Sequence, residues 1–248
     1  MTQLKAEGRL AWKSSSSSES GGTWSPFLGN LVVSTGGAAL AAGLAALDGK
    51  SNAVFHALGA GRFQWDAALS SPSKSDTGLV QEFYRAAPNN ISFVEEVEGL
   101  NELVSPDLAT ELHSAQFGAY GSLLVGRLVE IVAGTCSGDV REVIDISPTE
   151  SPVETIVLDS ALSAVPDTTT RWRVGVVSST PTQAVDIETT FLAGDGNSDG
   201  QIREQALFLG QATAEKDSGT MLSIVRHPAI SKSNTDLTQV WRIRIEVV

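Results

Sequence analysis

Residues 202–209, IREQALFL, decide the fold of this chain together with two later runs, MLSIVR at 221–226 and VWRIRI at 240–245. In each run apolar and polar residues alternate, so the apolar side chains share one face of a strand. We therefore expect the chain to close as an antiparallel sheet. The expected core residues of this sheet are Leu207, Trp241, Ile243 and Ile245.

The middle of the chain also has a β-type pattern. We expect strands at 123–133, 140–146, 155–158 and 171–177, separated by segments that contain Gly, Asp and Pro. Short strands at this spacing are typical of a small barrel or sandwich. We interpret residues 100–180 as an inserted β module.

The parts that flank this module are expected to form one discontinuous β-rich domain, residues 23–99 plus 181–248. In this topology residues 202–209 return to pack with strands that precede residue 100. The predicted fold class is mainly β: an antiparallel sheet or sandwich domain with one short Ala-rich helix, interrupted by an inserted small β-barrel or sandwich module.

The Ala-rich helix is expected at residues 38–47, because alanine has the highest helix propensity and Ser34 or Thr35 can cap the first turn. An Asp-Gly pair ends the segment. Its apolar face should lie on a sheet, since three leucines share one side of the helix. These core residues are Leu40, Leu44 and Leu47.

Residues 1–22 are expected to form a flexible arm, because five consecutive serines at 14–18 and a Glu-Ser-Gly-Gly run bury little apolar surface. Leu10 and Trp12 precede the serines. An aromatic side chain in such a segment can dock on a neighbouring subunit, and docking on its own domain is an equal alternative.

Composition and charge exclude several classes of protein. The 248 residues contain 17 Lys and Arg against 29 Asp and Glu, a net charge of −12, whereas nucleic-acid binding needs clustered cations. The most apolar window, residues 38–47, is far shorter than the ~20 residues of a membrane span. The N-terminus lacks the charged-then-apolar pattern of a signal peptide. We expect a soluble protein made in the cytosol, with no nucleic-acid or membrane partner.

Isolated reactive side chains are expected to have structural roles. His56 lies in the middle of a predicted strand without a second ligand at metal spacing, so a packed or hydrogen-bonded histidine is expected. Cys136 has no cysteine to pair with and is expected to be a buried small hydrophobe. We interpret Glu111 and His113 as a poor metal site, on the premise that they point in different directions. No cofactor is expected.

Two local patterns suggest short helical segments. Glu82 and Arg85 stand at i and i+3 and would pair on a helical turn. A second short helix is expected near residues 107–112. This second helix would lie in a connecting segment, residues 101–120.

One loop resembles the first half of a calcium loop. Asp195, Asn197 and Asp199 precede Gly200 at the spacing of such loops, but the twelfth position is Ala206 where a bidentate Glu is needed. Asp-Gly and Asn are also favoured in β-hairpin turns. We therefore favour a hairpin turn over a metal site.

The sequence gives no support for a catalytic site. It has only three histidines and no Gly-x-Ser-x-Gly motif, so an acyl-transfer triad is unsupported. The carboxylates Glu95, Glu96 and Glu98 are interpreted as a solvated strand edge, because adjacent residues on a strand face opposite ways. An alternative function is glycan binding through exposed aromatics, although the candidates are more typical of a core. These candidates are Trp65, Trp172 and Tyr120.

Three parts of the chain carry a resemblance to known proteins. The opening part comprises residues 30–33, the Gly/Ala segment, residues 57–61, Leu79, Glu82 and Arg85. The closing part comprises residues 202–204 and 206–208, Met221, Leu222, Arg226, Lys232 and Trp241. The part between comprises residues 126–129, Gly134, residues 138–141 and the strand before Pro166.

These parts resemble tailed-bacteriophage virion structural proteins. The resemblance implies a virion component, at the periphery of a tail or baseplate or on the capsid surface, commonly assembled as a homo-oligomer. We expect its copies to associate by strand-edge and arm contacts, and other virion proteins to be further partners. It implies no catalytic residues, and the Ser-rich segment at residues 14–18 departs from it. We expect a non-enzymatic structural protein, with an adhesin for a host surface glycan as the alternative and a polysaccharide hydrolase as a weaker one.

Overall fold

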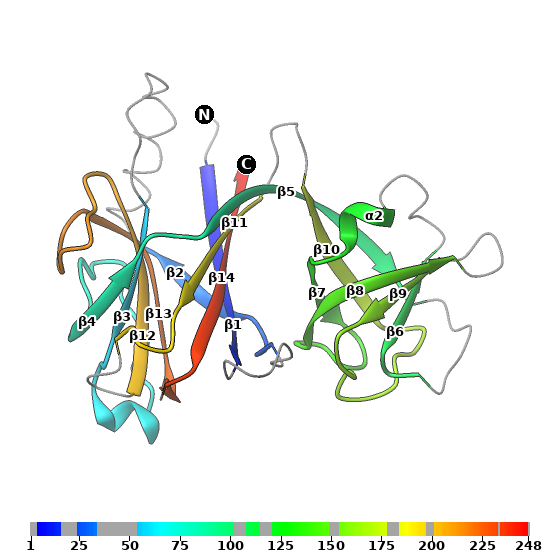
Figure 1. Cartoon of the computed structure of the whole chain (residues 1–248), viewed down its shortest axis with the longest axis horizontal. Helices are drawn as coiled ribbons and strands as arrows, with labels where there is room; N and C mark the ends of the chain where they lie inside the picture. The colour runs from blue at the N-terminus through cyan, green and yellow to red at the C-terminus, as the bar shows by residue number, and fades with distance from the viewer. Residues whose placement is uncertain are drawn as a thin grey trace. The chain divides into compact units, whose positions relative to one another are not determined.

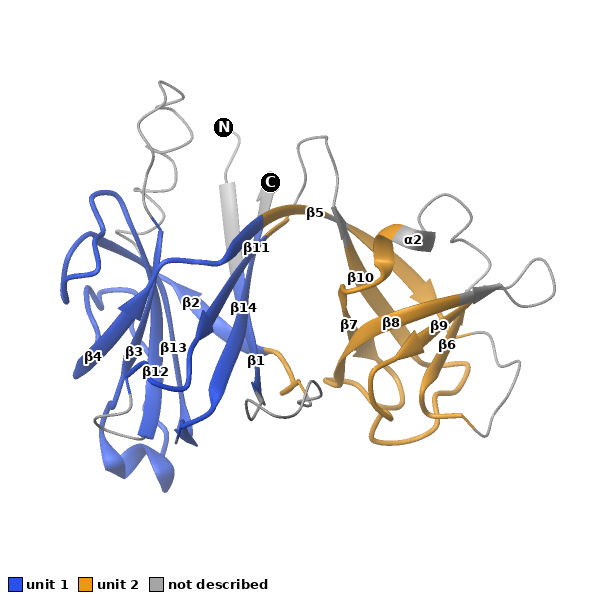
Figure 2. Ribbon diagram, viewed as in Figure 1, with its two compact units in different colours: residues 1–20, 28–91, 186–248 blue, residues 21–27, 92–185 orange. Residues whose placement is uncertain are grey.

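The computed structural model describes residues 4–15, 24–33, 54–101, 108–114, 121–148, 154–177, 184–196, 201–232 and 234–247. The chain divides into two compact units, one of residues 1–20, 28–91 and 186–248 and the other of residues 21–27 and 92–185 (Figure 2). Each contains a curled antiparallel sheet that forms a half-barrel, which confirms the mainly-β prediction. The predicted helix at 38–47, with Leu40, Leu44 and Leu47, lies outside the described residues.

Unit 1 contains eight of the strands drawn in Figure 1. Their sheet order is β4-β3-β12-β13-β2-β1-β14-β11. A short 3₁₀ helix, η1 (Phe63–Asp66), follows β3. The strands are β1 (Leu4–Ser15), β2 (Leu28–Val32), β3 (Phe55–Gly59), β4 (Glu82–Ala86), β11 (Ala184–Phe191), β12 (Gln201–Leu209), β13 (Thr220–Ser231) and β14 (Asp236–Val247).

The N-terminal segment is not an arm. Strand β1 pairs with β14 along its whole length, from Leu4 opposite Val247 to Ser15 opposite Asp236, and it also pairs with β2. Leu10 is fully buried. Apolar and polar residues alternate before the serines, which suits a strand with one buried face. The pairing with β14 continues past this part, so the first serines also lie in the strand. The prediction of a flexible arm is therefore wrong for residues 4–15.

The closing strands complete a core that the first part of the chain begins. Strand β12 pairs with β13 on one side and with β3 on the other, where Ala206 lies opposite Ala57. Residues before 100 and after 181 therefore share one sheet, as the sequence predicts. Leu207, Trp241 and Ile243 are buried, whereas the side chain of Ile245 lies outside the described residues.

Unit 2 holds the predicted module of residues 100–180. Its sheet order is β5-β10-β7-β8-β9-β6. The elements are β5 (Asn90–Leu100), β6 (Glu111–Ser114), α2 (Gly121–Leu124), β7 (Leu128–Ala133), β8 (Val140–Pro148), β9 (Glu154–Leu158) and β10 (Arg171–Val177). Two local predictions are wrong: residues 121–124 are helical where we expect a strand to begin, and Glu111 and Leu112 lie in β6 where we expect a helix.

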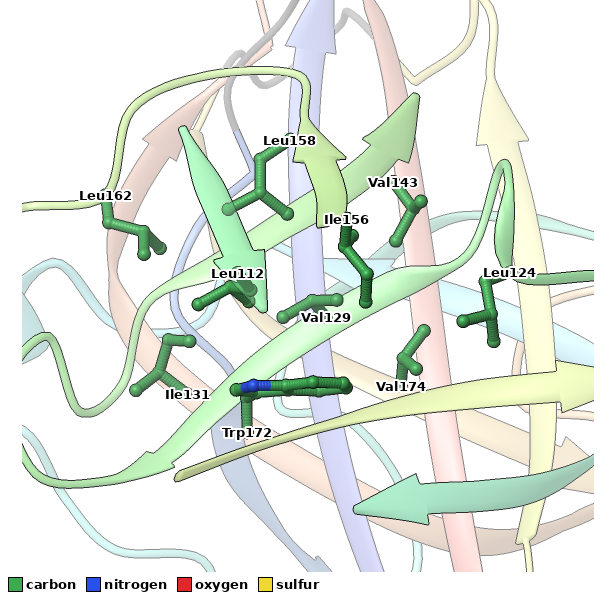
Figure 3. Packing of buried hydrophobic residues seen from close by; sticks show 10 residues of the cluster. All are labelled: Leu112, Leu124, Val129, Ile131, Val143, Ile156, Leu158, Leu162, Trp172 and Val174. Carbon is green, nitrogen blue, oxygen red and sulfur yellow. The ribbon is translucent and has the colours of Figure 1, made fainter. Parts of the chain in front are cut away.

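The core of unit 2 is packed around Trp172, which is fully buried (Figure 3). Strand pairing places Trp172 opposite Gly99 on β5, and a Cβ atom at Gly99 would overlap the indole ring. Glycine is thus required where the ring crosses the neighbouring backbone. The surrounding side chains are Leu112, Leu124, Val129, Ile131, Val143, Ile156, Leu158, Leu162 and Val174.

Candidate functional site

The interior of unit 1 contains a chain of buried polar side chains. The Nε2 atom of His56 lies 3.1 Å from Oε1 of Gln205, and Nε2 of Gln205 lies 2.9 Å from Nε2 of His227. Nδ1 of His227 lies 2.8 Å from the carbonyl oxygen of Pro228. Strands β3, β12 and β13 each contribute one member, and all three side chains are buried.

The chemistry of these contacts fixes both imidazole tautomers. Oε1 of Gln205 is an acceptor, so His56 donates through Nε2–H; the Gln205 amide donates to Nε2 of His227, which therefore carries its proton on Nδ1. Burial lowers the pKa of His56 to about 3 and that of His227 to about 4. Both rings are neutral at pH 7, which confirms the prediction of a hydrogen-bonded His56.

Aromatic rings enclose this polar chain. The His56 ring meets Phe191 and Trp241 edge-on, with centroids 5.2 and 5.1 Å apart, and Trp12 lies 5.3 Å from His227. Trp12 is partly buried and packs against the core of its own unit. Gln239, opposite Trp12 in the β1–β14 pairing, is fully buried, and neither of its amide atoms has a hydrogen-bond partner within the described residues.

A long surface loop of unit 1, residues 60–81, is fastened to the sheet by charged side chains, and we call it the clamped loop. Its first clamp is Asp66, whose two carboxylate oxygens accept hydrogen bonds from Arg203 at 2.9 and 2.7 Å. The backbone N–H of Ala229 also donates to Asp66, at 2.9 Å. These bonds lower the pKa of the Asp66 carboxyl, and the hydrogen bonds from Arg203 have the largest effect. One residue thereby joins the loop to β12 and β13.

The second clamp is Arg226 on β13. Its guanidinium donates to Asp76 at 2.9 Å and to the carbonyl oxygen of Ser71 at 3.0 Å. The same group lies over the ring of Trp65, 4.8 Å from the centroid, which is a cation–π arrangement. Trp65 is buried and packs against Gly61, whose φ of +57° and missing Cβ leave room for the ring.

The third clamp is Glu204 on β12, a fully buried carboxyl group. It accepts a hydrogen bond from the backbone N–H of Gln81 at 2.9 Å. Burial raises the pKa of Glu204, and backbone N–H groups of the loop oppose that rise. Its side chain crosses Gly59, where a Cβ atom would lie 2.6 Å from the Glu204 Cγ atom. Gly59 and Gly61 therefore have packing roles.

The turn that these clamps hold presents apolar side chains to solvent. Phe63 is 72% exposed and Leu69 is 49% exposed, whereas Trp65 between them is buried. The turn is closed by backbone hydrogen bonds from Trp65 to Arg62 and from Ala67 and Ala68 to Gln64. The result is an ordered turn with an apolar tip.

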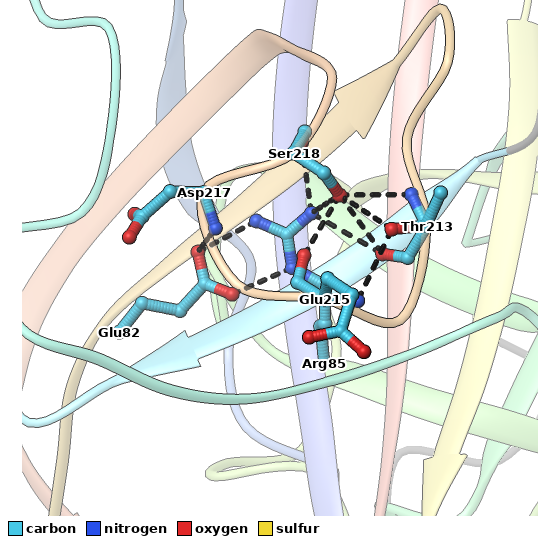
Figure 4. A network of polar contacts seen from close by, with 6 residues as sticks. All are labelled: Glu82, Arg85, Thr213, Glu215, Asp217 and Ser218. Atoms are coloured by element: carbon cyan, nitrogen blue, oxygen red, sulfur yellow. Dashed lines mark hydrogen bonds and ion pairs between the residues drawn. The ribbon is translucent and has the colours of Figure 1, made fainter.

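Glu82 and Arg85 form a buried ion pair, but not on a helical turn (Figure 4). Both lie on β4, and Arg85 donates to the two oxygens of Glu82 at 2.5 and 2.7 Å. Residues at i and i+3 on a regular strand face opposite ways. The β3–β4 register shifts at Leu58 and Gly59, so Phe83 is an extra residue that brings Glu82 and Arg85 to one side.

This ion pair also fixes the β12–β13 connection. Arg85 donates to the carbonyl oxygen of Ser218 at 2.8 Å, and its guanidinium lies 4.3 Å from the centroid of the Phe208 ring. The Ser218 hydroxyl accepts from the backbone N–H of Thr213 at 2.9 Å. The Glu82–Arg85 pair therefore holds this turn in place. Backbone groups of the turn provide hydrogen-bond partners that a buried ion pair needs.

The turn that resembles a calcium loop is held by a lysine. The ammonium group of Lys232 donates to the carbonyl oxygens of Leu192 and Asp195, both at 2.6 Å, and Lys232 is 2% exposed. The Asp195 carboxylate accepts the N–H of Leu192 at 2.9 Å. Asn197 and Asp199 lie outside the described residues.

The predicted hairpin at this turn is wrong. Strand β11 lies beside β14, whereas β12 lies between β3 and β13. Both edges of β12 are already paired, so the strands on either side of the turn cannot close a hairpin. The turn connects two separated positions of the sheet.

Other predicted residues have separate structural contacts. Glu111 and His113 lie on one face of β6, because alternate residues of a strand share a face, and the His113 Nε2 atom is 3.9 Å from Glu111. The premise that they diverge is wrong. His113 also lies 2.9 Å from the Thr155 hydroxyl, and burial lowers its pKa. Cys136 is only partly buried and donates to the carbonyl oxygen of Ala164.

The carboxylate cluster on β5 is not a simple solvated edge. Glu98 is exposed, but the Glu96 side chain is 9% exposed and lies 3.4 Å from Arg173. Arg173 also binds Glu130 at 2.7 Å. The side chain of Glu95 lies outside the described residues.

Of the aromatic residues considered for glycan binding, Trp65 and Trp172 are buried, and Tyr120 lies outside the described residues. Across the described ranges, no three or more His, Cys, Asp or Glu side chains are grouped so as to hold a metal ion. No helix in that part of the chain is long and apolar enough to cross a membrane.

Comparison with known proteins gives no family assignment. No protein-family model matches the chain, and no curated protein matches it significantly.

Proposed function

We propose that this chain is a non-enzymatic structural subunit of a bacteriophage virion, at the periphery of the tail or baseplate or on the capsid surface. Copies of the chain associate with one another and with other virion proteins. The opening, middle and closing parts of the chain resemble tailed-bacteriophage virion structural proteins, and this resemblance supports the proposal. The resemblance implies no catalytic residues. The physical support comes from how the charged residues of unit 1 are used.

The observation that carries the proposal is the clamped loop. Three buried or half-buried side chains of the sheet, Arg203, Glu204 and Arg226, hold residues 60–81 in place. Surface loops that a rigid scaffold holds in position commonly carry binding residues. A loop fixed before binding loses little conformational entropy on association, which favours a contact surface. Phe63 and Leu69 supply the apolar area.

The ionisable side chains around the sheet act on the protein itself. His56 and His227 are bonded to Gln205, Glu204 binds loop backbone, and the Glu82–Arg85 pair binds the Ser218 turn. Each of these groups is held by neighbouring atoms of the chain, whereas an acid or base in catalysis needs access to a substrate proton. This use of charge favours a structural subunit over a hydrolase.

Two measurements test the proposal. Light scattering of the purified full chain over a wide concentration range should give a mass that is a multiple of the 26.0 kDa monomer. Antibody against the chain should label tailed particles purified from the same source. A monomer at every concentration would contradict the homo-oligomer, and unlabelled particles would contradict the virion role. Truncation of residues 1–22 is unsuitable as a test, because it would remove β1 from the sheet.

A further inference from the structure

We infer that residues 62–69, here called the knob, dock on an acidic face of a second copy of this chain. The inference rests on the proposed function, because it names the surface through which copies associate. The knob combines three features: exposed apolar side chains, a rigid attachment, and a local positive charge on a chain whose net charge is −12.

The knob contains one buried aromatic residue among several exposed residues. Trp65 is 5% exposed and points to the sheet, whereas Phe63 is 72% exposed and Leu69 is 49% exposed. Arg62, Ala67 and Ala68 are exposed as well. Aromatic side chains and arginine are enriched at protein interfaces. Single exposed apolar residues are ordinary on protein surfaces, and the knob differs from them in its rigidity and its charge.

Rigidity comes from Trp65 and Asp66, in the middle of the knob. Asp66 binds the guanidinium of Arg203 through both oxygens and also accepts the Ala229 N–H. Trp65 lies beneath Arg226. The knob is therefore presented in a fixed conformation, and its apolar tip can bind without a large loss of entropy.

The charge of the clamped loop is positive once its clamps are included. The loop itself contains two cations and two anions. Arg203 and Arg226 neutralise the two anions, Asp66 and Asp76. The remaining cations are Arg62 and Lys74, both exposed and, within the described residues, in no ion pair. The third clamp, Glu204, is formally an anion, so the loop and its clamps together carry one positive charge in excess.

Charge complementarity points to a second copy as the partner. Outside the clamped loop and its clamps, the chain is more acidic than its net charge of −12 indicates. Copies of such a chain repel one another, except where the basic knob meets an acidic surface. Because the knob and its acidic partner face are different surfaces, the contact is heterologous and closes into a ring or continues as a filament.

Single substitutions in the knob test this inference. Phe63→Ser removes the apolar tip and Arg62→Glu reverses the charge, and neither replaces a buried side chain. Leu192→Ser is the matched control, because Leu192 is 58% exposed but lies outside the knob. We expect both knob variants to raise the dissociation constant about tenfold or more, as interface anchors do, while the control leaves it unchanged. Circular dichroism and melting temperature check that each variant is folded.

The outcomes separate this inference from the proposed function. A wild-type chain that is monomeric at every concentration overturns both. A wild-type oligomer that both knob variants leave intact overturns only the docking inference. A photo-crosslinking amino acid at position 63 gives an independent readout: crosslinks to an Asp/Glu-rich peptide of a second copy support it, and crosslinks confined to the same chain refute it.

Discussion

Acid should destabilise unit 1 through the two buried histidines, and the size of the effect follows from their pKa values. In the unfolded chain each imidazole takes up a proton near pH 6.5. In the folded chain burial lowers the pKa of His56 to about 3 and that of His227 to about 4. Between these limits the unfolded state binds more protons, so stability falls as the pH falls below about 6.5.

The expected loss is large compared with the stability of a domain. Each histidine contributes about 1.4 kcal/mol per pH unit inside its window, so two histidines cost about 5 kcal/mol between pH 6.5 and 4.5. Domains are stable by about 5–15 kcal/mol. Glu204 acts in the opposite direction, because burial raises its pKa and protonation on acidification relieves that cost. The Gln205 bond offers no compensation, since its N–H already points at Nε2 of His227.

Urea unfolding at pH 7.5, 6.5, 5.5 and 4.5 measures this loss. The double variant His56→Gln and His227→Gln keeps amide donors and acceptors in place of the imidazoles but does not titrate. We expect the loss of unfolding free energy to shrink by most of the ~5 kcal/mol. His113→Gln in unit 2 is the control and should leave the unit 1 response unchanged. A double variant with the same pH dependence as the wild type would refute the reasoning.

Three further predictions concern single buried side chains, each measured by chemical or thermal unfolding. Gln205→Leu should cost about 1–3 kcal/mol for each imidazole left without its partner, whereas Gln239→Leu should be neutral or stabilising, and equal losses would contradict the assignment. Lys232→Met should lower the melting temperature, and calcium chelation should leave that of the wild type unchanged; a shift on chelation would indicate a metal. Trp241→Ala should cost about 3–5 kcal/mol, since Trp241 is fully buried, and an unchanged melting temperature would exclude this packing.

Local patterns in the sequence predicted most strands of the closing sheet, but they missed strands whose partners lie far away in the chain. The alternation at 202–209, 221–226 and 240–245 is a property of neighbouring residues, and it identifies β12, β13 and β14. The same alternation is present before the serines at 14–18, yet composition favoured an arm there. Strand β1 exists because β14 pairs with it, and pairing between residues so far apart leaves no local trace.

The errors at polar residues have two physical origins. The Glu82–Arg85 spacing is typical of a helical turn, and only the extra residue Phe83 makes it compatible with a strand. For Glu111 and His113 the origin is strand periodicity, which places alternate residues on one face. The clamps on residues 60–81 could not be predicted, since each joins residues that are far apart in the sequence.

In strand β12, consecutive residues show both a local strand pattern and contacts with residues far away in the sequence. Its apolar positions identify a strand, but Arg203, Glu204 and Gln205 each hold a different part of unit 1. Arg203 binds the knob at Asp66, Glu204 binds the end of the clamped loop, and Gln205 joins His56 to His227. The register shift between Ile202 and Glu204 marks a departure from regular pairing where these roles meet. A substitution at any of the three should therefore affect a distinct property: presentation of the knob, attachment of the loop, or acid resistance of the interior.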